Sequence, residues 1–124
     1  MSKVIIIDDE PFILMMIEDK LKKANIDVVT LRESKNAVEI IKKEMPDLII
    51  LDWMMPELSG IELCRILKKD PDLLNIPIFM LTAKGQDSDE QLGLKCGVVR
   101  YITKPFSPKS LLEMVQETLG KDKY

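Results

Sequence analysis

Short apolar segments alternate with longer amphipathic segments five times along this chain, and this alternation constrains the fold more than any other feature. Three of the apolar segments, at residues 4–7, 48–51 and 78–81, contain no polar residue. Continuous apolar runs of this length are typical of strands that helices cover on both faces. The pattern therefore predicts repeated βα units around a parallel sheet.

The expected strands are residues 3–8, 27–31, 48–52, 78–82 and 99–102, of which the second and fifth are weaker and suit outer positions. The expected helices are residues 11–24, 34–44, 60–69, 88–96 and a last one opened by Ser107-Pro108. Gly97 is a candidate left-handed cap after the fourth helix. Because crossovers between parallel strands are right-handed, this order predicts an open five-stranded α/β sheet between two helical layers, α/β/α.

The length of 124 residues suits one domain, which we place at residues 1–120, with residues 121–124 as a tail or the start of a linker. No window approaches the roughly 20 apolar residues that a membrane-spanning helix needs. The N-terminus does not resemble a secretory signal, so we expect a cytoplasmic protein without membrane insertion. A net charge of -3 provides no basic surface, and direct nucleic-acid binding is therefore not expected.

The chain has no histidine and only two cysteines. The absence of histidine removes the usual general base and the commonest zinc ligand. Cys64 and Cys96 lack Cys-x-x-Cys spacing, so we expect both to be reduced, partly buried apolar residues. Any chemistry must therefore use carboxylates, lysine, hydroxyl groups and hard metal ions.

Polar residues that could bind a metal ion or take part in a reaction lie at the ends of four of the predicted strands: Asp8-Asp9-Glu10, Asp52, Thr82 and Lys104. Ligands of such sheets bind beyond the carboxyl ends of the strands, where the strand order reverses. Clustered carboxylates repel one another and favour a divalent cation, and a site with few carboxylates suits Mg²⁺ better than Ca²⁺. A phosphoryl group could then sit on Asp52 as an acyl phosphate, with its oxygens near the metal, Lys104 and Thr82.

Four motifs contain these residues: Val4-Ile5-Ile6-Ile7-Asp8-Asp9-Glu10, Asp47-Leu48-Ile49-Ile50-Leu51-Asp52-Trp53-Met54-Met55-Pro56, Leu81-Thr82-Ala83-Lys84 and Lys104-Pro105-Phe106. With them the sequence resembles, over essentially its whole length, the response-regulator receiver domains of two-component systems, of the single-domain chemotaxis and sporulation type. The resemblance implies a flavodoxin-like, doubly wound sheet with strand order 2-1-3-4-5.

The resemblance also implies roles for individual residues. It makes Asp52 the phosphoacceptor and Lys104 a bridge to the phosphoryl group, with a cis peptide between Lys104 and Pro105. The implied Mg²⁺ ligands are Asp9 directly, Asp8 through water, Asp52, and the main-chain carbonyl of Met54.

Thr82 and Tyr101 resemble the switch pair of the family, in which the hydroxyl turns toward the phosphoryl group and the ring moves inward. Two neighbours of the site have simpler roles in this interpretation. Gly60 serves the turn that opens the third helix, and Trp53 either shields the site or fills its loop.

The implied partners are a sensor histidine kinase or histidine phosphotransfer protein as donor, and a downstream effector protein or a C-terminal output domain as receiver of the signal. Partners would read the state of the face formed by the fourth helix, fifth strand and fifth helix. Such a protein assists its own phosphorylation and dephosphorylation but is not a turnover enzyme.

Three other interpretations remain. A phosphatase of the haloacid-dehalogenase type also uses an Asp nucleophile and magnesium, but places Asp-x-Asp on its first strand, where this chain has Asp8-Asp9-Glu10. A flavodoxin-like flavin binder would need hydrogen-bond donors in that loop to hold a phosphate. A binding module of the same shape that is never phosphorylated would have no need for the acidic cluster.

Overall fold

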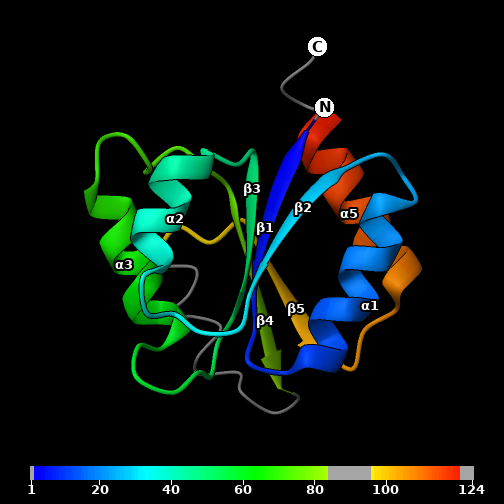
Figure 1. The fold of residues 1–124 in the computed structure, drawn as a ribbon, viewed down its shortest axis with the longest axis horizontal. Helices are drawn as coiled ribbons and strands as arrows, with labels where there is room; N and C mark the ends of the chain where they lie inside the picture. Colours follow the sequence, from blue (N-terminus) through cyan, green and yellow to red (C-terminus); the bar gives the residue numbers. More distant parts are fainter. Residues whose placement is uncertain (1, 84–95, 121–124) are drawn as a thin grey trace.

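The computed structural model describes residues 2–83 and 96–120, and in this part of the chain a parallel sheet of five strands lies between helices (Figure 1). The strands are β1 (Lys3–Ile7), β2 (Asp27–Leu31), β3 (Leu48–Asp52), β4 (Ile78–Ala83) and β5 (Arg100–Lys104). Their order is β2-β1-β3-β4-β5, and every neighbouring pair is parallel. The predicted doubly wound, flavodoxin-like fold is confirmed.

Four helices lie in the described ranges: α1 (Pro11–Lys22), α2 (Ala37–Glu44), α3 (Gly60–Lys69) and α5 (Pro108–Gly120). α2 and α3 cover one face of the sheet, and α1 and α5 cover the other (Figure 1). The helix predicted at residues 88–96 lies outside the described residues apart from Cys96, as does the predicted tail at residues 121–124. None of the described helices combines the length and apolarity needed to cross a lipid bilayer.

Two helix boundaries differ from the prediction because of residues in the left-handed backbone region. α1 ends at Lys22 instead of residue 24, and the following turn contains Asn25 with a φ of 64°. α2 begins at Ala37 instead of residue 34, because Asn36 has a φ of 66° and cannot continue a right-handed helix. Ser34 is buried ahead of this turn, and its hydroxyl donates to the carbonyl of Pro56 at 3.4 Å.

The strand boundaries also shift by one or two residues. β1 ends at Ile7 instead of residue 8, and β5 covers residues 100–104 instead of 99–102. β4 and β5 each extend further than predicted, because Ala83 pairs with Lys104 at the end of their ladder. The extension holds the main chain of Lys104 in the sheet.

The sheet separates two apolar clusters. On β1, Ile5 and Ile7 pack toward α2 and α3, whereas Val4 and Ile6 pack toward α1 and α5. β3 alternates in the same way, because successive side chains of a strand point to opposite faces. The three central strands are therefore buried on both sides, as the continuous apolar runs predict, and polar side chains are left to their ends.

Candidate functional site

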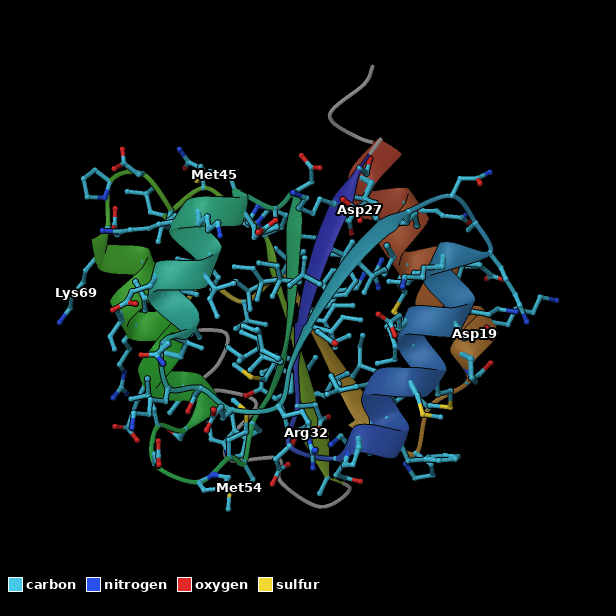
Figure 2. All side chains as sticks on the ribbon, in the orientation of Figure 1. Asp19, Asp27, Arg32, Met45, Met54 and Lys69 are labelled. Carbon is cyan, nitrogen blue, oxygen red and sulfur yellow. The ribbon has the colours of Figure 1, made fainter. Side chains whose placement is uncertain are left out.

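Asp8, Asp52, Thr82 and Lys104 all lie at the carboxyl end of the sheet, as predicted from the sequence. Asp52 is the last residue of β3, and Asp8 directly follows β1. The side chain of Asp8 is fully buried and Asp52 is only 5% exposed. Figure 2 shows Met54 and Arg32 at this same end of the sheet.

Lys104 lies at the centre of this end. Its Nζ atom contacts three carboxylates, at 2.9 Å from Asp8 Oδ2, 3.0 Å from Glu10 Oε1 and 3.3 Å from Asp52 Oδ1. The peptide bond between Lys104 and Pro105 is cis. One ammonium group therefore links the loop after β1, the end of β3 and the end of β5.

Burial and repulsion between like charges shape the ionisation of these groups. Burial, together with the repulsion from the neighbouring Asp8 carboxylate, raises the pKa of Asp52 to about 7, although Lys104 acts in the opposite direction. Burial also raises the pKa of Asp8 above its ordinary value. Burial opposes the charged form of Lys104, but its contacts with the carboxylates outweigh this effect and raise the pKa of Lys104. The single ammonium group does not fully compensate the acidic cluster.

The carboxylate of Asp8 shows where further positive charge would fit. Its Oδ1 accepts a hydrogen bond from the main-chain N–H of Glu10 at 2.9 Å. Its Oδ2 is buried and forms the ion pair with Lys104, but no described group donates an aligned hydrogen bond to it. Carboxylate oxygens of Asp8, Asp9 and Glu10 lie within 4.8 Å of one another. This set of oxygen donors fits a hard divalent cation such as Mg²⁺.

A pocket of about 250 Å³ opens beside these carboxylates. Its lining residues are Asp9, Glu10, Asp52, Trp53, Met54, Ala83 and Lys104. Since a water molecule occupies roughly 30 Å³ in the liquid, the pocket has room for a hydrated ion together with a small anionic group. Asp52 is thus a buried carboxylate at the edge of a space that a reactant can enter.

Thr82 and Tyr101, the predicted switch pair, lie on the same face of adjacent strands. Thr82 is 5% exposed, and its hydroxyl donates to the carbonyl of Ala83 at 3.4 Å. Tyr101 pairs with Met80, which lies two residues before Thr82 on β4 and therefore on the same face. The ring centroid of Tyr101 lies 6.3 Å from that of Trp53. Trp53 both lines the pocket and joins the apolar cluster under α2 and α3, so it fills its loop and borders the site.

Sequence reasoning missed contributions from two residues. The sequence puts Glu10 in the acidic loop without indicating a role of its own, yet Glu10 is one of the three carboxylates that contact Lys104. Gly60 does more than open a turn: its N–H donates to the carbonyl of Trp53 at 2.9 Å, and a Cβ atom there would collide with the carbonyl oxygen of Asp52. The sequence pattern does not mark this close approach.

A family model described as the response regulator receiver domain matches residues 4–116 of the chain. Among curated proteins, the chain is 44% identical over 118 residues to the phosphate regulon transcriptional regulatory protein PhoB of Pseudomonas aeruginosa, covering 95% of this chain and 52% of that protein. It is 39% identical to the alkaline phosphatase synthesis transcriptional regulatory protein PhoP of Bacillus subtilis, covering 97% of this chain and 49% of that protein. The chain thus spans about half the length of these relatives.

Solved structures give the same result. The receiver domain of the Francisella response regulator 1452 superposes with a TM-score of 0.89 at 34% identity, covering 98% of this chain and 99% of that one. The BeF3-activated N-terminal receiver domain of Klebsiella pneumoniae RstA gives a TM-score of 0.87 at 34% identity, covering 95% of this chain and 98% of that one.

Proposed function

Since this chain belongs to the response regulator receiver domain family, we propose that it is a phosphorylation-controlled switch whose phosphoryl acceptor is Asp52. The observation that supports this most directly is the environment of Asp52. Its carboxylate ends a buried strand, borders the pocket, and lies 3.3 Å from the ammonium group of Lys104. A receiver domain is a signalling domain, and we propose that this one works by binding partners in two states, without substrate turnover.

The proposed reaction is a phosphoryl transfer from a phosphohistidine of a sensor histidine kinase or a histidine phosphotransfer protein. A carboxylate oxygen of Asp52 attacks the phosphorus atom, the phosphorus–nitrogen bond breaks, and its electron pair stays with the imidazole. The phosphohistidine lies outside this chain, because the chain has no histidine. Lys104, already beside Asp52, would neutralise negative charge on the phosphoryl oxygens.

Receiver domains are generally Mg²⁺-dependent, and the donor set at this site fits that ion. We propose that Asp8, Asp9 and Asp52 would hold it together with the main-chain carbonyl of Met54. Bound there, Mg²⁺ would supply the positive charge that a second anionic group at Asp52 requires. Glu10 would compete with Asp52 for the ammonium group of Lys104. Phosphorylation of Asp52 would therefore have to rearrange the contact between Glu10 and Lys104.

Phosphorylation adds up to about two negative charges beside a buried hydroxyl and a half-buried ring. The proposed response is a shift between two packings, in which Thr82 turns toward the phosphoryl group and Tyr101 moves inward. The signal would pass to a downstream effector protein or to a C-terminal output domain in the cytoplasm. Relatives about twice as long as this chain, which are transcriptional regulators by name, support the second arrangement.

Intact-protein mass spectrometry tests the proposal. The chain is incubated with acetyl phosphate or phosphoramidate, with Mg²⁺ or with a chelator, alongside Asp52→Asn and the exposed control Asp72→Asn. We expect the natural chain and Asp72→Asn to gain one phosphoryl mass only with Mg²⁺, and Asp52→Asn to gain none. Mg²⁺-dependent phosphorylation of the Asp52→Asn variant would refute the proposal that Asp52 is the phosphoryl acceptor. No gain in any protein would instead indicate a receiver-shaped binding module that is not phosphorylated.

A further inference from the structure

The two cysteines of the chain, 32 residues apart in sequence, lie against each other on the α3 side of the sheet. The thiol of Cys64 donates to the main-chain carbonyl of Cys96 at 3.6 Å. The thiol of Cys96 points back to the carbonyl of Ile61, one turn before Cys64 in α3, at 4.0 Å. Each thiol therefore reaches the main chain that carries the other cysteine.

The surroundings of the two thiols differ. Cys64 is fully buried among the apolar residues between α3 and the sheet, whereas Cys96 is partly exposed at the edge of the same cluster. Burial and the adjacent Cys96 thiol raise the pKa of the Cys64 thiol to about 12. A solvent-borne oxidant can therefore reach Cys96 first, because Cys64 is shielded from solvent behind it.

We propose that Cys64 and Cys96 form a reversible intramolecular disulfide under peroxide, which joins α3 to the turn before β5. The Cys96 sulfur attacks one oxygen of the peroxide; the O–O bond breaks, Cys96 becomes a sulfenic acid, and the departing hydroxide takes the Cys96 thiol proton to give water. The Cys64 sulfur then attacks the sulfenic sulfur, the S–O bond breaks, and the departing hydroxide takes the Cys64 proton. Two thiols and one hydrogen peroxide thus give one disulfide and two waters.

The position of the bond gives it a mechanical effect. Cys96 and Gly97 form the turn that leads into β5 at Arg100. A covalent link from Cys96 to Cys64 fixes this turn to α3 and closes a long loop of the chain. By restricting the unfolded chain, a link across such a loop should raise the melting temperature by about 10 °C. Phosphorylation is not needed for this chemistry, so its test is independent of the role of Asp52.

The test treats the full chain with hydrogen peroxide and follows it by intact mass spectrometry, thiol alkylation in urea, and peptide mapping. We expect the natural chain to lose the mass of two hydrogen atoms and both alkylation sites, to yield a peptide linking Cys64 to Cys96, and to recover with dithiothreitol. The oxidised chain should melt at the higher temperature.

Matched variants separate the two steps. Cys64→Ala should stop at a sulfenic acid on Cys96 that dimedone traps, whereas Cys96→Ser should keep an unreacted thiol until it is unfolded. The natural chain alone decides the proposal if either variant folds poorly. Oxygen adducts without a linking peptide, disulfide-linked dimers, or two thiols that react only in urea would each overturn it.

Discussion

Replacing Asp52 with asparagine should make the protein more stable once divalent metals are removed by a chelator. The pKa of Asp52 is about 7 against an ordinary value of 3.8, because of its burial and the repulsion from Asp8. At about 1.4 kcal/mol per pH unit, this difference sets an upper limit of about 4 kcal/mol on the cost of ionising Asp52 in the folded protein. Asparagine keeps the shape of the side chain without this cost.

The sign of the pH dependence follows from proton binding. The folded protein holds the Asp52 proton more tightly than the unfolded chain, so the free energy of unfolding falls as pH rises from 3.8 toward 7 and levels off above that. Asp52→Asn has no such loss. Its stability advantage should therefore widen by about 2 kcal/mol between about pH 5.5 and about pH 8.5. This range lies above the isoelectric point near 5.1, where solubility is poorest.

Urea unfolding followed by far-ultraviolet circular dichroism, in a buffer with a chelator, measures the advantage directly. Asp72→Asn removes an exposed carboxylate and should show no such widening. Adding Mg²⁺ should narrow the gap, because an ion that binds only the folded natural chain stabilises it. An advantage that does not change with pH, or a variant less stable than the natural chain at the alkaline end, would refute the reasoning.

Three further substitutions test other contacts. Lys104→Ala should still be phosphorylated slowly in the mass assay but should transmit the phosphorylation signal poorly to a partner. Normal partner switching in this variant would count against the role assigned to Lys104. Thr82→Ala should blunt the phosphorylation-dependent response with Mg²⁺ affinity almost unchanged by calorimetry, whereas a large loss of Mg²⁺ binding would contradict its role. Gly60→Ala should destabilise the protein by about 2 kcal/mol, since the new methyl group collides with the Asp52 carbonyl, and an unchanged urea midpoint would contradict that packing.

The fold could be predicted from the sequence because its determinants are local and periodic. Short runs such as residues 48–51, apolar on both faces, are typical of strands covered on two sides, and the right-handed crossover rule then restricts how these strands are arranged. The gathering of Asp8, Asp52 and Lys104 follows from the same topology, since parallel strands end at one edge. Predicted boundaries failed where a single residue adopts the left-handed region, as at Asn36, because nothing in the periodicity marks it.

The features that could not be predicted from the sequence depend on contacts between segments that are distant along the chain. The proximity of Cys64 and Cys96 depends on how α3 packs beside the turn before β5. Their separation of 32 residues in the sequence does not indicate this contact. The contact between Glu10 and Lys104 depends in the same way on side-chain reach across the sheet edge. Periodicity identifies the face of an element that is buried, but not which side chain of a neighbouring element meets it.

The chain contains a single tryptophan, and its position gives the protein an internal optical reporter. Trp53 directly follows Asp52, is 6% exposed, and has its ring centroid 6.3 Å from that of Tyr101. All indole emission therefore arises beside the acidic pocket, next to the aromatic ring that is proposed to move. We expect intrinsic fluorescence to report the proposed cation binding and the proposed movement of the Tyr101 ring in real time, on unlabelled protein, without a competing signal from another indole of this chain.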